Sequence, residues 1–178
     1  GMAYLDGVLS GLECRTVKNF EVILVDNGSV DGSCAFVAAS YPWVRLIELP
    51  ENFGFCKAVN EGIKASRASY VLLLNNDIEV TRDFIEQMLQ GIRRHPKAFS
   101  GAARMIQFHD RDRLDDAGNY YCALGWAFAR GKGKNIHTYE KEEKIFASCA
   151  GAAIYRKDIF EKIGYFDEEH FAYLEDMD

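Results

Sequence analysis

The feature that most constrains the fold is a short apolar run, Tyr70–Leu74, which is followed directly by Asn75, Asn76 and Asp77. An apolar run without alternating polar positions is typical of a strand that is covered on both faces. Polar side chains that follow such a strand come to the edge of an open α/β sheet, where ligands bind. We therefore expect Asp77 at a place where a metal ion or a phosphate group can bind.

Strand-like and helix-like patterns alternate through the first half of the chain. Strands are expected at 20–25, 44–49 and 70–74, and helices at 4–12, 33–37, 58–63 and 81–92. This order predicts a parallel, right-handed α/β sheet. The second half is less regular, with strands expected at 98–106 and 146–155, a helix at 157–163, and a functional loop or flap at 107–144.

Size and composition are those of a globular protein. A chain of 178 residues, 48% hydrophobic and 27% charged, fits one domain with a substantial core. The net charge of −6 argues against a nucleic-acid-binding protein, which would present a basic face. The five scattered cysteines predict free thiols, and no apolar segment has the length of a membrane span or a signal sequence. The sequence thus predicts a cytoplasmic protein.

Polar residues stand at three separate places along the chain: Asp26 and Asn27 after the first strand, Asp77 after the third, and Glu175 and Asp176 near the C-terminus. Each has an ordinary explanation. Asp26 can form a hydrogen bond to the backbone of its own turn. Asp77 can belong to the turn that leads into the next helix, and Glu175 and Asp176 can be charged side chains exposed to solvent. None of the three predicts a function alone.

Taken with their surroundings, these places resemble the family 2 glycosyltransferases, which belong to the nucleotide-diphospho-sugar transferase superfamily and have the A-type glycosyltransferase fold. The matching segments are 20–33, 52–55, 60–63, 73–77, 151–156, 164–168 and 173–178. The resemblance covers most of the chain except 107–144. It implies a three-layer α/β/α fold with a mainly parallel central sheet. It also implies one domain over 1–178, with a nucleotide-binding half (1–105) and an acceptor and catalytic half (106–178).

The resemblance implies metal-dependent, inverting transfer of a sugar from a nucleotide-diphospho-sugar to an acceptor hydroxyl. The rhamnosyltransferase-like branch is the most similar, because Asn-Asn-Asp occurs in its third-strand motif. The expected partners are Mg²⁺ or Mn²⁺, a donor nucleotide sugar and a saccharide or lipid-linked acceptor. Cell-surface polysaccharide synthesis at the inner face of the membrane, with peripheral membrane association, follows from the same resemblance.

The resemblance also implies particular donor-binding residues. They are Asp26, Asn27, Lys57, Asn75, Asn76, Gly151 and Ala152. Asp77 matches the last acid of the family's Asp-X-Asp metal motif, and Asn75 stands where the first acid would be. Asp26 matches the position that bonds the nucleotide base, since a carboxylate can accept from a uracil or thymine N–H. Lys57 could contact phosphate or be a solvated helix lysine.

Two further roles follow for small and acidic residues. Gly151 and Ala152 are expected to leave room beside the donor sugar. Asp176 matches the family's catalytic base, with Glu175 as the alternative. An inverting enzyme needs such a base on the face opposite the leaving diphosphate, and adjacent carboxylates raise each other's proton affinity.

The sequence also departs from the family pattern. The family's first strand, a central one, would precede residue 4, and a further portion would follow residue 178. The chain is therefore expected to be a fragment in which another copy could fill the slot of the missing strand. A nucleotidyltransferase of the same fold and a non-catalytic sugar-nucleotide-binding domain remain alternatives. A glycosidase is excluded, because Glu175 and Asp176 are chain neighbours and cannot flank a bond.

Overall fold

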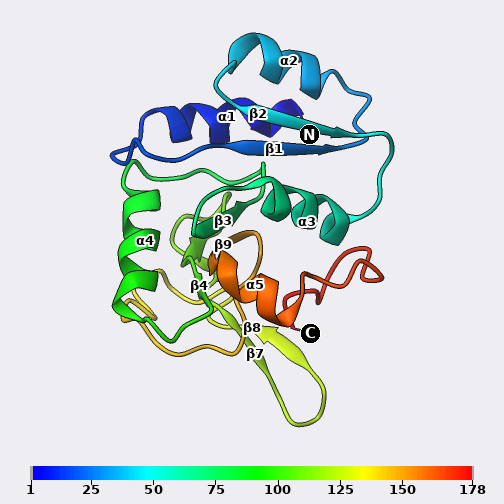
Figure 1. The fold of residues 1–178 in the computed structure, drawn as a ribbon. Helices are drawn as coiled ribbons and strands as arrows, with labels where there is room; N and C mark the ends of the chain where they lie inside the picture. Colours follow the sequence, from blue (N-terminus) through cyan, green and yellow to red (C-terminus); the bar gives the residue numbers. More distant parts are fainter. Residues whose placement is uncertain (1, 178) are drawn as a thin grey trace.

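The structure, a computed structural model, describes residues 2–177 (Figure 1). Gly1 and Asp178, the last residue of the C-terminal motif, lie outside the described residues. The helices are α1 (Met2–Glu13), α2 (Ser33–Ser40), α3 (Phe55–Ala65), α4 (Phe84–Arg94) and α5 (Lys157–Ile163). The strands are β1 (Ile23–Asn27), β2 (Arg45–Leu49), β3 (Tyr70–Leu74), β4 (Ser100–Ala102), β5 (Met105–Ile106), β6 (Leu114–Asp116), β7 (Asn119–Tyr121), β8 (Ala127–Ala129) and β9 (Ala152–Arg156).

The strands form mixed sheets and not one mainly parallel sheet. β1 and β2 pair in parallel, whereas β3, β9 and β4 form an antiparallel sheet in that order. Because β3 and β4 each run antiparallel to β9, they run parallel to each other, with α4 as their crossover. The physical reason for the difference is that β9, which comes from the second half of the chain, lies between them. The short pairs β5–β6 and β7–β8 are also antiparallel.

β3 is packed on both faces, as its uninterrupted apolar sequence predicts. Leu72 and Leu74 pack against a core cluster built from α1, α2 and α4. Val71 and Leu73 pack against a second cluster, which contains Ile63 of α3 and residues of β9 and α5. Alternate side chains of one strand therefore reach two cores, and β3 delivers its C-terminal end to the surface.

The second half differs from the sequence prediction in detail. The single strand expected at 98–106 is divided into β4 and β5, and the one at 146–155 is shorter and begins at Ala152. The segment 107–144 is not a plain loop, since it contains β6, β7 and β8. In the part of the chain that the structure describes, no helix combines the length and apolar character of a membrane span.

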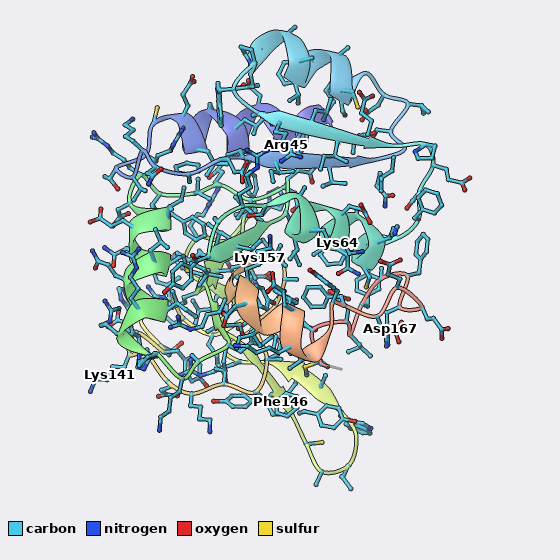
Figure 2. All side chains as sticks on the ribbon, viewed as in Figure 1. Arg45, Lys64, Lys141, Phe146, Lys157 and Asp167 are labelled. Carbon is cyan, nitrogen blue, oxygen red and sulfur yellow. The ribbon has the colours of Figure 1, made fainter. Side chains whose placement is uncertain are left out.

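The segment after α5 runs back along α3 (Figure 1). Figure 2 shows Asp167 on this segment and Lys64 on the helix above it. The Phe55 N–H, at the start of α3, donates to the Phe171 carbonyl at 2.6 Å. A Cβ on Gly54 would come within 2.6 Å of the same carbonyl oxygen, and Gly54 has φ +87°, so this close approach requires glycine. The segment thereby brings residues 175 and 176 to the interior side of the molecule.

Candidate functional site

Asp26, at the end of β1, is buried and bonds within its own turn. Its Oδ2 accepts from the Ser29 backbone N–H at 2.9 Å. Burial alone would raise the pKa of Asp26, but hydrogen bonds from Ser29 and Cys34 lower it below the ordinary value. The carboxylate therefore stays ionised and can accept hydrogen bonds. Its expected role in binding a nucleotide base stays a prediction.

Asn27 links β1 to the loop before α3. Its side-chain Nδ2 donates to the Asn52 side chain and to the Gly54 carbonyl, both at 2.9 Å. Its Oδ1 accepts from the Phe53 N–H at 3.0 Å. Both ends of the amide are thus used within the protein, and Asn27 shapes the loop beside Asp26.

The end of β3 lies beside the start of β9. The Asn75 N–H donates to the Gly151 carbonyl at 2.9 Å, and Leu74 pairs with Ala152 in the sheet. A Cβ added to Gly151 would lie 3.5 Å from Asn75 Nδ2. Two predicted donor-binding segments, far apart in the sequence, are therefore neighbours. Ala152 itself is buried and packs inside the protein.

Asp77 is exposed two residues beyond Asn75. Within residues 2–177, its carboxylate has no hydrogen-bond or ion-pair partner. The oxygen-rich set of Asp77, Asn75 and Asn76 has the hard donors that Mg²⁺ or Mn²⁺ prefers. No group of three His, Cys, Asp or Glu side chains in the described residues could hold a metal alone. The residues fit an ion that is bound by one carboxylate together with substrate phosphates.

Lys57, on α3, is engaged by two carboxylates. Its Nζ lies 3.1 Å from Glu61 and 3.3 Å from Glu168, and these contacts raise its pKa above the ordinary value. The ammonium thus ties the C-terminal segment to α3. A phosphate contact for Lys57 stays a prediction, and it would compete with both ion pairs.

Glu175 and Asp176 are partly buried. Burial is the main cause that raises the pKa of each carboxyl above its usual range. The Glu175 pKa is raised further by the Asp176 charge, and one Glu175 oxygen, Oε2, is buried without a hydrogen-bond partner within residues 2–177. Asp176 Oδ2 accepts from Asn119 Nδ2 at 2.7 Å. The Asp176 carboxylate is therefore oriented by a side chain from a distant part of the chain.

Further acidic groups surround this pair. Asp116 of β6 is 5% exposed, and burial raises its pKa. Cys149 and Tyr155 also have raised pKa values because they are buried near these carboxylates. A buried group of acids with raised proton affinity is a feature of sites that accept or donate protons.

Asn119 and Asp116 are site residues that the sequence alone did not predict. Both belong to the turn at 116–119, inside the segment expected to be a loop. The available signal was Asp-Ala-Gly-Asn, which favours a tight turn but does not reveal a contact with residue 176.

Comparison with known proteins identifies a family and relatives that this chain resembles. The family described as Glycosyl transferase family 2 matches residues 3–164. An N-acetylglucosaminyl-diphospho-decaprenol L-rhamnosyltransferase of Mycobacterium tuberculosis is 27% identical over 98% of this chain and 64% of its own length. Glycosyltransferase GlyA of Streptococcus pneumoniae is 25% identical over 91% of this chain and 24% of its own. The chain thus spans less than two thirds of these relatives.

Solved structures have the same fold. TarS 1-349 of S. aureus in complex with UDP superposes with a TM-score of 0.69 at 20% identity, covering 98% of this chain and 49% of that one. The mannosyltransferase PcManGT from Pyrobaculum calidifontis, in complex with GDP-Man and Mn²⁺, gives 0.67 at 15% identity, covering 95% and 45%. At these identities the likeness establishes an α/β glycosyltransferase fold.

Proposed function

Because the chain belongs to glycosyl transferase family 2, we propose that it transfers a sugar from a nucleotide-diphospho-sugar to an acceptor hydroxyl, with inversion at the anomeric carbon. The observation that carries this proposal is the Asp176 carboxylate, which is partly buried, has raised proton affinity and is held at one oxygen by Asn119. A base with these properties is suited to take a proton at near-neutral pH.

Asp176 is the general base and Glu175 lies beside it. The acceptor oxygen attacks the anomeric carbon, the bond from that carbon to the diphosphate breaks, and the acceptor proton passes to Asp176. The Asp176 charge raises the pKa of Glu175 beside it. Ionised Asp26 accepts from the nucleotide base, while Asn27 fixes the adjoining loop.

Asp77 would hold the divalent ion, with the Asn75 and Asn76 amides beside it. When bound there, such an ion would neutralise negative charge on the leaving diphosphate. The net charge of −6 makes this compensation important, and Lys57, a cation near the start of α3, is already paired. Gly151 leaves room next to Asn75 for the donor. The two cores on either side of β3 support the expected three-layer arrangement.

The acceptor approaches from the side of the β7–β8 hairpin. Asn119, the first residue of β7, contacts Asp176, so a hydroxyl that reaches this base comes beside the hairpin. Tyr121 and Phe146 are stacked there with ring centroids 5.7 Å apart, and each is at least 50% exposed. Aromatic faces suit the C–H face of a sugar ring. The M. tuberculosis relative is named for a lipid-linked acceptor, and we extend a saccharide or lipid-linked acceptor to this chain.

Replacement of Asp77 tests the donor and metal part of the proposal. In the full-length protein, Asp77→Ala should weaken Mn²⁺-dependent binding of UDP or dTDP more than about 10-fold, since loss of even an outer-shell partner has that effect. Isothermal titration calorimetry measures this. Glu79→Ala is the control, because Glu79 is exposed and pairs with Arg111. Equal nucleotide affinity in Asp77→Ala and Glu79→Ala would refute the metal role of Asp77.

A further inference from the structure

The contact between Asn119 and Asp176 joins residues that are 57 positions apart. Asn119 Nδ2 donates to Asp176 Oδ2 at 2.7 Å, a short distance for an N–H donor and typical of a bond to an ionised carboxylate. Both residues are partly buried, so water competes less with this bond than it would at the surface. The amide therefore defines where one oxygen of the carboxylate lies.

Asn119 is itself held by its backbone. Its N–H donates to the Ala147 carbonyl at 2.9 Å, and its carbonyl accepts from the N–H groups of Phe146 and Ala147 at 3.1 and 3.2 Å. A residue with such a fixed backbone can place its side chain with little freedom.

The preceding turn fixes the direction in which Asn119 leaves. Gly118 has φ +106°, and a Cβ at this position would lie 2.6 Å from Ile145 Cδ1, so the turn requires glycine. The Gly118 N–H donates to the buried Asp116 carboxylate. The turn before Asn119 is thus fixed by the hydrogen bond to Asp116 and by the close contact of Gly118 with Ile145.

We propose that Asn119 is a positioning residue for Asp176: it holds Oδ2 and leaves the other carboxylate oxygen to receive the proton of the acceptor hydroxyl. This inference rests on the proposed function, in which Asp176 is the base. An amide suits the role because its NH₂ group donates to a carboxylate without adding charge.

The surroundings of Asp176 explain why a donor is needed there. Within residues 2–177, the Asp176 charge acts on Asp116 from β6, Cys149 before β9, Tyr155 from β9 and its neighbour Glu175. Each of these groups is an acid. Burial raises the pKa of Asp176, and the Asn119 hydrogen bond acts in the opposite direction. Without Asn119, the pKa of Asp176 would be higher. Asp176 would then be ionised, and able to act as a base, over a narrower range of pH.

The pH profile of kcat in the full-length protein tests the inference. Asn119→Ala should move the acid limb up by about one pH unit and lower kcat about 10-fold, with the KM for the donor unchanged. Asn119→Asp has nearly the same shape as asparagine, and it should move the limb further because it adds a negative charge. Asn135→Ala, whose amide bonds the His137 N–H in an exposed turn, is the control and should leave the profile unmoved.

A ¹³C NMR titration of the Asp176 carboxyl group gives a result that does not depend on turnover. The Asp176 pKa should be higher in Asn119→Ala and in Asn119→Asp than in the parent and in Asn135→Ala. If the parent transfers sugar and the Asp176 pKa is the same in all four proteins, Asn119 is not a positioning residue. If the Asp176 pKa rises in both Asn119 variants but the parent transfers no sugar, the hydrogen bond between Asn119 and Asp176 is supported. The proposed function is then wrong, and so is the positioning role of Asn119, which depends on it.

Discussion

Asp116 is a buried carboxyl group whose charged form destabilises the fold, although its oxygen makes a hydrogen bond that the turn needs. It is 5% exposed, and it accepts the Gly118 N–H that fixes the turn before Asn119. Burial raises its pKa, so the folded protein binds the Asp116 proton more tightly than the unfolded chain does. The charged form is therefore disfavoured in the fold, although the hydrogen bond of the turn needs an oxygen at this place.

Asp116→Asn should make the protein more stable at neutral pH. Because the folded pKa is raised, the Asp116 contribution to stability is fully present below the unfolded value of 3.8 and is lost as the pH rises through the folded pKa. Asparagine keeps an oxygen acceptor for Gly118 and carries no charge. We expect the unfolding midpoint to rise by about 2–4 °C at pH 7, the effect of 1 kcal/mol in a chain of this size.

Thermal unfolding of Asp116→Asn and the parent between pH 3.5 and 7.5 measures this effect. The difference in midpoint should vanish near the acid end of the range. A variant that is less stable than the parent at pH 7 would show that the Asp116 charge stabilises the fold and that our view of this residue is wrong.

The sequence predicted some site residues and missed others for a clear physical reason. Asp77 and Asp176 stand in local motifs, at the end of an apolar strand and in a Glu-Asp pair, so neighbouring residues are enough to single them out. Asn119 is recognised only through its bond to Asp176, and Asp116 only through its burial. Contacts between distant residues leave no periodic pattern in the chain.

The C-terminal segment, residues 166–177, is held in place by α3. Asn60 is 1% exposed, and its side chain donates to the Phe166 carbonyl at 2.8 Å and to Glu168 at 3.1 Å. It also accepts from the Phe166 N–H at 3.2 Å. One buried amide thus supplies the hydrogen-bond partners that the Phe166 backbone N–H and carbonyl would have in a helix or strand. This contact fixes the start of the segment that leads to Asp176.

Asn60→Ala should destabilise the protein by about 2–3 kcal/mol, because both backbone groups of Phe166 lose a buried partner. Urea unfolding measures the change in free energy. Amide hydrogen exchange should become faster in the segment 166–177 and less so in β3. Asn135→Ala is the matched control and should change the free energy of unfolding by less than about 0.5 kcal/mol. Unchanged exchange at 166–177 in Asn60→Ala would contradict the anchoring role.

The first half of the fold was predictable because each element has its own pattern. Tyr70–Leu74 is a strand with the predicted bounds, and Arg45–Leu49 differs from its predicted range by one residue. The pairing of β9 was not predictable, because its insertion between β3 and β4 depends on tertiary packing and not on its own sequence. The same reason explains why the predicted mainly parallel sheet is a mixed one.

The overall charge of the chain constrains how an anionic donor can bind. The chain carries a net charge of −6, and acids surround Asp176. A nucleoside diphosphate would be repelled by this field unless positive charge accompanies it. In the proposed function, a divalent ion held by Asp77 would supply that charge.

Removal of divalent ions should therefore abolish nucleotide binding without changing the stability of the fold. With EDTA, binding of UDP or dTDP should be lost, and the unfolding midpoint of the nucleotide-free protein should stay the same. Calorimetry and thermal unfolding on one preparation, with Mn²⁺ added back as the control, measure both. Undiminished nucleotide binding in EDTA would contradict the metal requirement, and a large fall in the midpoint would reveal a structural ion instead.

In the proposed sugar-transfer reaction, Asp176 takes the proton of the acceptor hydroxyl. Asp176→Asn in the full-length protein keeps the shape of the side chain and removes its ability to accept a proton. The rate of sugar transfer should fall by about 10²–10⁴-fold, the usual contribution of a general base. The affinity for the donor with Mn²⁺, measured on the same sample, should not change. Transfer by Asp176→Asn at a rate close to that of the parent would show that Asp176 is not the general base.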